Sequence, residues 1–170
     1  MICVLMGVSG CGKTTIGQLL AAELQCPFLD ADDFHPASNL AKMKQGIPLT
    51  DTDRWPWLDA IRTAAVAQVT ERRKVVMACS ALKQEYRSRL DPRSSNHPGN
   101  FRANSPIHFV HLQGEFALIE SRLKSRRHFM PPSLLASQFA DLEPPTDALV
   151  VEINQTPEQI VHAIRRALAL

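Results

Sequence analysis

The sequence predicts an α/β fold, a three-layer arrangement in which a five-stranded parallel sheet carries helices on both faces. Five short apolar runs are spaced along the chain, helical patterns separate them, and a glycine-rich loop follows the first run. Such alternation is typical of parallel sheets, whose crossover connections place helices on both faces. With 170 residues, 45% of them hydrophobic, the chain has enough apolar side chains for one core. We therefore expect residues 1–170 to form a single domain.

The expected strands are residues 2–6, 26–30, 75–78, 107–112 and 149–153. The third, Val-Val-Met-Ala, is a continuous apolar run, which is typical of a parallel strand buried on both faces. Polar residues follow several of these strands. Because ligands in parallel sheets bind at the carboxyl ends of the strands, these polar residues are expected to meet at one edge.

The expected helices are residues 15–24, 38–44, 53–71, 83–90, 115–126, 133–142 and 157–170. Each shows apolar residues at helical spacing or a flanking stop signal. Asp53 is the expected cap of the third helix, with Pro56 in its first turn. Residues 30–36 are expected to form a polar loop, and residues 91–106 a long surface loop.

The glycine-rich loop fits the pattern G-x-x-x-x-G-K-[ST] in full, between a strand and a helix, as a phosphate-binding loop requires. Its backbone N–H groups and the helix N-terminus would hold phosphates. Lys13 would reach the β- and γ-phosphates, and the Thr14 hydroxyl would ligate Mg²⁺. A chance glycine loop is the weaker alternative. The expected ATP-binding residues here are Gly7, Val8, Ser9, Gly10, Cys11, Gly12, Lys13, Thr14 and Thr15.

Two acids decide between classes of nucleotide-binding protein. No N-K-x-D guanine motif is present, and the strand at 75–78 ends in Cys79-Ser80 rather than in the acid of a motor ATPase. Instead, Asp30 and Asp32 follow the second strand, which favours a small-molecule kinase. Asp30 would support the metal, and Asp32 would accept the proton of an attacking hydroxyl. Alternatively, both acids solvate a turn or cap a helix.

Composition excludes several other classes of protein. A net charge of +2 is too small to indicate nucleic-acid binding. The N-terminus lacks a basic signal-peptide region, and no apolar run approaches the ~20 residues of a membrane span. The four cysteines, Cys3, Cys11, Cys26 and Cys79, lack metal-ligand spacing. These features predict a cytoplasmic protein without membrane or nucleic-acid partners.

Longer motifs in the chain resemble the signatures of gluconokinases, in the same order and from the first strand to about Pro145. Within this span, only residues 91–106 fall outside the resemblance. The matching segments are Asp30-Ala31-Asp32-Asp33-Phe34-His35-Pro36 with Asn39 and Lys42-Met43, then Gly46-Ile47-Pro48-Leu49 with Asp51 to Leu58, then Cys79-Ser80-Ala81-Leu82-Lys83 with Tyr86-Arg87, and finally Arg122 to Pro132 with Ser137-Gln138-Phe139 and Leu142-Glu143-Pro144.

The resemblance implies a P-loop kinase fold with a helical lid and ATP-dependent phosphorylation of D-gluconate to 6-phosphogluconate, which feeds the pentose phosphate pathway. It implies ATP and Mg²⁺ as cofactors and a homodimer. The acceptor-binding segment would span about residues 33–60, and the lid about 121–138. A related kinase acting on shikimate or another small hydroxyl acceptor, and a weakly active nucleotide-binding protein, remain alternatives.

A sugar acid needs a cation for its carboxylate and polar partners for its hydroxyls. Arg54 can hold a carboxylate bidentately, and Asp32, His35, Ser80 and Lys83 are the other expected acceptor-binding residues. Each has a structural alternative: Arg54 can pair with a nearby aspartate, His35 can cap a turn, and Lys83 can be a solvated helix residue.

Arg122 and Arg126 lie four positions apart and share one helical face, where they could clamp the transferring phosphate in a closing lid. A solvated helix face is the alternative. The chain reads Arg126-Arg127-His128-Phe129, where gluconokinases usually have a glycine before the histidine. Whether Arg126 or Arg127 faces the phosphate is therefore left open.

Overall fold

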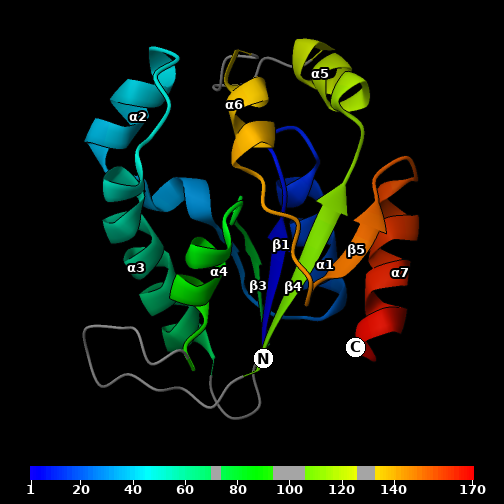
Figure 1. The fold of residues 1–170 in the computed structure, drawn as a ribbon. Coiled ribbons are helices and arrows are strands. Elements are labelled where there is room, and N and C mark those ends of the chain that lie inside the picture. The colour runs from blue at the N-terminus through cyan, green and yellow to red at the C-terminus, as the bar shows by residue number, and fades with distance from the viewer. Residues whose placement is uncertain (70–73, 94–105, 126–132) are drawn as a thin grey trace.

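The computed structural model describes residues 1–69, 74–93, 106–125 and 133–170, and its centre is one parallel sheet (Figure 1). The spatial order of the five strands is β2-β3-β1-β4-β5, and all pairings are parallel. The predicted α/β fold is therefore confirmed. The strands are β1 (Ile2–Met6), β2 (Phe28–Asp30), β3 (Val75–Ala78), β4 (Ile107–Gln113) and β5 (Leu149–Glu152).

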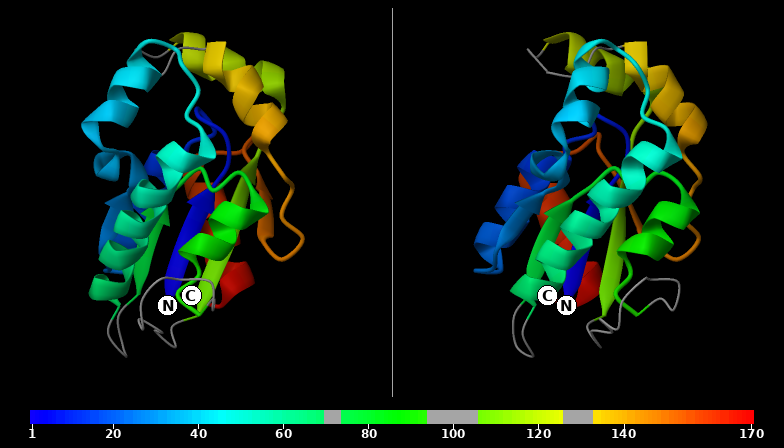
Figure 2. Two further views of the ribbon diagram at one scale, coloured as in Figure 1. Left: turned by 60° about the vertical axis from the view of Figure 1, so that its left-hand side comes forward. Right: turned by 90° about the vertical axis from the view of Figure 1, so that its left-hand side faces the viewer.

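Helices cover both faces of this sheet in three layers (Figure 2). Helices α1 and α7 pack together on one face, and α3 and α4 on the other. Helices α2, α5 and α6 lie above the carboxyl ends of the strands (Figure 1). The bounds are α1 (Lys13–Glu23), α2 (Ala37–Lys44), α3 (Asp51–Gln68), α4 (Gln84–Leu90), α5 (Phe116–Ser125), α6 (Ser133–Asp141) and α7 (Pro157–Leu168).

The central strand β1 supplies side chains to two cores. Cys3 and Leu5 face the core under α1 and α7, whereas Ile2, Val4 and Met6 face the core under α3 and α4. Successive residues of a strand point to opposite faces, so a strand between two helical layers must be apolar at every position. This explains the unbroken apolar runs of β1 and β3.

Two local predictions were wrong. Thr50, not Asp53, caps α3, which begins at Asp51. The two residues form a capping box: the Asp53 N–H donates to the Thr50 hydroxyl (3.3 Å), and the Thr50 N–H donates to the Asp53 carboxylate (2.9 Å). The expected loop after β2 contains a 3₁₀ helix, Ala31–Phe34, because the Asp30 side chain caps it.

The strand order brings three functional segments to one edge. β1 leads into the phosphate loop, β2 into Asp30 and Asp32, and β3 into Cys79 and Ser80; β3 lies between the other two. Among the described helices, none combines the length and apolar character that crossing a bilayer requires. The predicted lid (121–138) and the loop at 91–106 lie only partly within the described residues, and Arg126 and Arg127 lie outside them.

Candidate active site

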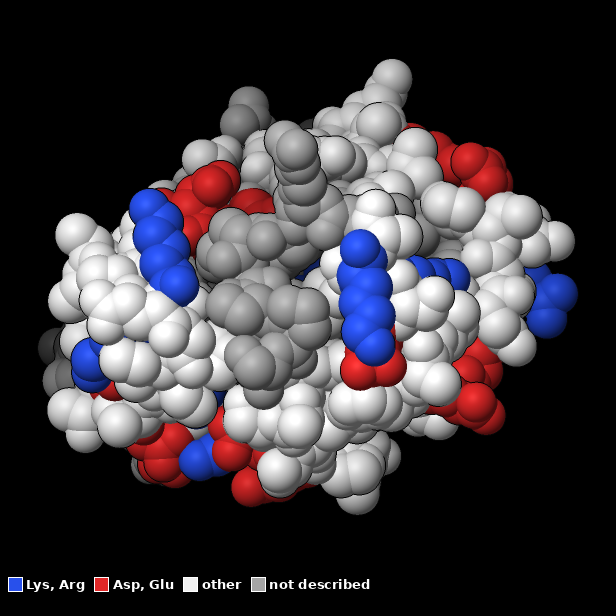
Figure 3. All heavy atoms as spheres, turned by 90° about the horizontal axis from the view of Figure 1, so that it is seen from above, with Lys and Arg blue, Asp and Glu red and all other residues white. Residues whose placement is uncertain are grey.

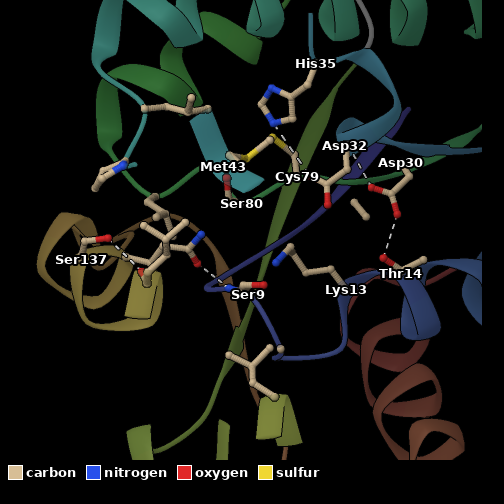
Figure 4. A pocket seen from close by; sticks show the side chains of 18 of the residues that line it. Ser9, Lys13, Thr14, Asp30, Asp32, His35, Met43, Cys79, Ser80 and Ser137 are labelled. Atoms are coloured by element: carbon tan, nitrogen blue, oxygen red, sulfur yellow. Dashed lines mark hydrogen bonds and ion pairs between the residues drawn. The ribbon is translucent and has the colours of Figure 1, made fainter. Parts of the chain in front are cut away.

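A cavity of about 330 Å³ opens at the carboxyl edge of the sheet. Figure 4 shows side chains from the phosphate loop, the turn after β2, the end of β3 and α6 pointing into it. Most of the site residues predicted from the sequence line this cavity: Ser9, Gly10, Gly12, Lys13, Thr14, Thr15, Asp30, Asp32, His35, Arg54, Ser80 and Arg122. The predicted residues that do not line it are Gly7, Val8, Cys11 and Lys83.

The phosphate loop takes its shape from glycines with positive φ angles. Gly10 has φ of 85°, and a Cβ there would lie 2.8 Å from Leu123 of α5. Gly12, with φ of 103°, immediately precedes α1. The Lys13 ammonium donates to the carbonyls of Gly7 and Val8, each at 3.0 Å. The loop therefore presents a helix N-terminus and a cation to the cavity, as phosphate binding requires.

The first acid after β2 contacts the phosphate loop directly. The Thr14 hydroxyl donates to Asp30 Oδ2 (2.8 Å), and Asp30 Oδ1 accepts the backbone N–H of Asp32 (3.1 Å). A hydroxyl beside a carboxylate is a donor set that suits Mg²⁺, a hard cation that binds oxygen. The backbone hydrogen bond fixes the turn that carries Asp32 into the cavity (Figure 4).

His35 lies over the cavity with its ring stacked on Trp57, at a centroid separation of 4.3 Å and an interplanar angle of 14°. The indole N–H of Trp57 donates to the Ala31 carbonyl (2.6 Å), which fixes the plane of the stack. Burial, and secondarily the charge of Arg54, lower the pKa of His35 from 6.5 to about 4. The ring is therefore neutral near pH 7.

Arg54 reaches the cavity from α3 and is held by residues of two other helices. Its guanidinium donates to the Tyr86 hydroxyl of α4 (2.6 Å) and to Asp141 at the end of α6 (3.4 Å). The Tyr86 hydroxyl in turn donates to Asp51. Lys83 forms an ion pair with Asp51 (2.8 Å), which places this predicted acceptor residue in the network that supports Arg54.

Among the cavity-lining side chains that were not predicted as site residues, Gln138 contacts the phosphate loop. The backbone N–H of Ser9 in the phosphate loop donates to Gln138 Oε1 of α6 (2.6 Å). The two residues are 129 positions apart, so no local spacing could have revealed the contact. The Ser-Gln-Phe segment of the family resemblance was the only signal at this position. Gln138 links α6 to the loop that would hold phosphate.

Two further residues, the predicted Arg122 and its cavity neighbour Cys79, have defined surroundings. Arg122 lines the cavity and donates to the Ile153 carbonyl (2.8 Å), which ties α5 to the end of β5. Cys79 is fully buried beside Ser80, and this burial raises the pKa of its thiol to about 12. A thiolate nucleophile at Cys79 is therefore excluded near neutral pH.

The face above the carboxyl ends of the strands carries acidic and basic side chains interspersed (Figure 3). No broad patch of one sign gathers among the described residues visible on this face. This pattern agrees with the small net charge of +2. It gives no support to a nucleic-acid-binding surface, which would need clustered lysine and arginine.

Known proteins resemble the chain over nearly its whole length. The model of the shikimate kinase family matches residues 9–168. A probable gluconokinase of Xenopus tropicalis is 47% identical over 86% of this chain and 80% of its own length. The thermosensitive gluconokinase of Escherichia coli K12 is 41% identical over 97% and 86% of the two chains. A solved gluconokinase structure from Sinorhizobium meliloti is 40% identical, has a TM-score of 0.82 and covers 98% and 90%.

Proposed function

The chain belongs to the gluconokinase family, and from this membership we propose that it transfers the γ-phosphoryl group of ATP to the 6-hydroxyl of D-gluconate. The observation that carries the proposal is the meeting of three elements in one cavity. These are a phosphate loop, a pair of acids after β2, and Arg54 as a cation for the acceptor carboxylate. The products are 6-phosphogluconate and ADP.

The donor side of the cavity is formed by the phosphate loop. The loop N–H groups and Lys13 would neutralise the phosphates of ATP, the donor that kinases of this family use. Thr14 and Asp30 are the residues that would hold Mg²⁺, which would supply positive charge to offset that of the phosphates. Arg122 would contact the phosphates from α5.

The acceptor side is formed by Asp32, His35, Arg54 and Ser80. Arg54 retains guanidinium N–H donors beyond its bonds to Tyr86 and Asp141, and a carboxylate can accept two of them. Lys83 does not line the cavity, so we propose that it acts through Asp51, which it orients beside Tyr86. The polar groups of Asp32, His35, Arg54 and Ser80 suit a chain of hydroxyl groups.

The transfer step follows from these positions. The acceptor hydroxyl oxygen attacks the γ-phosphorus and forms the new P–O bond. The bond from that phosphorus to the β,γ-bridging oxygen breaks, and its electron pair leaves with ADP. Asp32 takes the hydroxyl proton. In such transfers the protein contributes mainly position and electrostatic stabilisation.

An acceptor panel with MgATP and coupled detection of ADP tests the proposed function. The panel contains D-gluconate, shikimate, a nucleoside monophosphate and D-glucose. We expect turnover with gluconate to exceed that with every other acceptor by at least about 100-fold. Higher turnover with shikimate, whose kinase family also matches the chain, would contradict the choice of acceptor while leaving the kinase activity intact.

We further propose that residues 1–170 act as one domain, in the cytoplasm and as a homodimer, with residues 33–60 binding the acceptor and residues 121–138 forming the lid. Whether Arg126 or Arg127 completes the lid lies outside the described residues. Separate R126A and R127A variants test this assignment. Substitution of the arginine that faces the phosphate should lower kcat more than substitution of the other.

A further inference from the structure

A hydrogen-bond chain behind His35 determines which of its ring nitrogens carries the proton. Asn39, in the first turn of α2, is only 1% exposed. Its amide nitrogen donates to the Asp53 carbonyl (2.9 Å) and lies 3.4 Å from His35 Nδ1. Because a backbone carbonyl can only accept, the NH₂ group of Asn39, not its oxygen, must face Asp53 and His35.

The orientation of Asn39 fixes the histidine tautomer. A nitrogen that receives an N–H from Asn39 cannot itself carry a proton, and a neutral imidazole carries one proton in total. His35 is neutral near pH 7, because burial lowers its pKa to about 4. The proton must therefore be on Nε2. The stack on Trp57 holds the ring plane, so this N–H has a fixed direction.

The protonated nitrogen faces Asp32 across a gap. His35 Nε2 lies 4.0 Å from Asp32 Oδ1, too far for a direct hydrogen bond. One oxygen atom can lie within about 2.8 Å of both atoms. Both side chains line the cavity and point into it (Figure 4). A donor and an acceptor at this separation match a hydroxyl group, which accepts one hydrogen bond and donates another.

We propose that His35 and Asp32 bind one acceptor hydroxyl between them, and that Asn39 is the positioning residue that keeps the proton on His35 Nε2. The hydroxyl oxygen accepts the Nε2–H while its own proton points to Asp32. This proposal rests on the proposed function, in which Asp32 takes the proton of the hydroxyl that is phosphorylated. The His35 N–H then also stabilises negative charge on that oxygen as the proton leaves.

The tautomer is measured by two-bond ¹H–¹⁵N correlation spectra of the full chain labelled with ¹⁵N-histidine, without any substrate. The His35 resonance is identified by its nuclear Overhauser contacts to Trp57. We expect the Nε2–H form in the wild type. In Asn39→Asp the side chain can only accept, so we expect the proton to move to Nδ1. A wild-type spectrum with the proton on Nδ1 would overturn the proposal.

Kinetics give a second test that does not depend on Asn39. Glutamine can place an N–H near the position of Nε2, and asparagine only near that of Nδ1. We therefore expect His35→Gln to retain kcat/KM for gluconate within about tenfold of the wild type, and His35→Asn to lose at least a further tenfold. Equal losses in the two variants would contradict a hydroxyl-binding Nε2–H.

Asn39→Asp is compared with Asn154→Asp, which adds the same charge at an exposed position outside the cavity. We expect Asn39→Asp to lower kcat/KM for gluconate about tenfold or more with the dissociation constant of ATP within about twofold, and Asn154→Asp to change neither. Loss of ATP affinity in Asn39→Asp would indicate general disruption and count against a positioning role. If gluconate is not an acceptor at all, the proposed function fails, whereas the tautomer measurement stands by itself.

Discussion

At the scale of single residues, Lys13 is the side chain whose loss should separate activity from stability most clearly. Its ammonium contacts two loop carbonyls at 3.0 Å, and removing these bonds costs about 1–2 kcal/mol of folding free energy. Removing a preorganised cation from a phosphate site costs about 10²–10³ in rate. We expect Lys13→Ala to lose kcat/KM by that factor with a small fall in Tm.

The matched control is Lys74→Ala, because Lys74 immediately precedes β3 and so lies at the amino ends of the strands, away from the cavity at their carboxyl ends. It should lower Tm slightly and leave kcat/KM unchanged. Steady-state kinetics and thermal denaturation on the same preparations make the comparison. If Lys13→Ala lost activity only in proportion to its melting temperature, a role for the ammonium in phosphate binding would be refuted.

Asp32 is the second residue whose substitution should lower activity strongly. Asp32→Asn keeps the size of the side chain but removes a base for the hydroxyl proton, so we expect kcat to fall about 10²–10⁴-fold. Asp33→Asn is the control: Asp33 neighbours it on the same 3₁₀ helix, is exposed and does not line the cavity. Equal kcat in the two variants would exclude Asp32 as the proton acceptor.

The sequence predicted residues of the site only where a local pattern carries the chemistry. The phosphate loop is one continuous motif, and Asp30 follows a recognisable strand, so their meeting at Thr14 could be expected from parallel-sheet geometry. Gln138 could not, because its contact with Ser9 depends on how α6 packs onto the loop. Lys83 was expected beside the acceptor, but its charge is paired with Asp51.

At the scale of secondary-structure elements, Tyr86 joins α4 to α3. Its hydroxyl accepts from Arg54 (2.6 Å) and donates to Asp51, so it holds the guanidinium in place. In Tyr86→Phe both bonds are lost while the ring still packs in the core. We expect KM for gluconate to rise about five- to tenfold, which is the loss of about one hydrogen bond, with kcat nearly unchanged.

KM for ATP is the internal control for Tyr86→Phe and should not change. Tyr86 does not line the cavity, and Arg54, which it holds, is on the acceptor side of the cavity. Initial rates at varied gluconate and at varied ATP give both constants. A rise in KM for ATP equal to the rise for gluconate would contradict a role confined to Arg54.

We expect helix α6 to compete with the nucleotide for the phosphate loop. The single N–H of Ser9 is occupied by Gln138 Oε1 at 2.6 Å, where a phosphate oxygen would otherwise accept it. ATP must replace that bond, so we expect Gln138→Ala to bind ATP about two- to tenfold more tightly in calorimetric titrations without acceptor. Ser137→Ala, on the same helix, is the control. Weaker binding of ATP by Gln138→Ala would show that the amide assists the nucleotide instead.

At the scale of the whole molecule, the fold was predictable because the strands are short and mostly apolar, and because each is separated from the next by a helical pattern. The order β2-β3-β1-β4-β5 was not predicted, since it depends on which strands pair across crossovers. The cap of α3 was misplaced by three residues because both Thr50 and Asp53 have side chains that can cap a helix. Local ambiguity of this kind leaves the architecture unchanged.

Stability of the whole molecule should fall as the pH is lowered below about 6.5. Burial is the first cause of a lowered pKa at both His35 and His111, and the pKa of His35 falls to about 4. Between pH 6.5 and about 4 the unfolded chain therefore binds protons that the folded chain does not, so the free energy of unfolding decreases with decreasing pH. One such proton contributes at most about 1.4 kcal/mol per pH unit, less where solvent reaches the ring.

Carboxylates affect the free energy of unfolding in a second, lower range of pH. Hydrogen bonds from Lys42 and Thr50 lower the pKa of Asp53 from 3.8 to about 2, so its stabilising contribution is present above pH 3.8 and is lost as the pH falls through about 2.

Urea denaturation from pH 7 to pH 4.5 isolates the pH range in which the histidines affect stability. His35→Gln cannot take up the proton, so the slope of unfolding free energy against pH should be smaller in this variant than in the wild type. Identical slopes in the two proteins would mean that His35 titrates equally in the folded and unfolded chains, and would contradict its burial as a neutral ring.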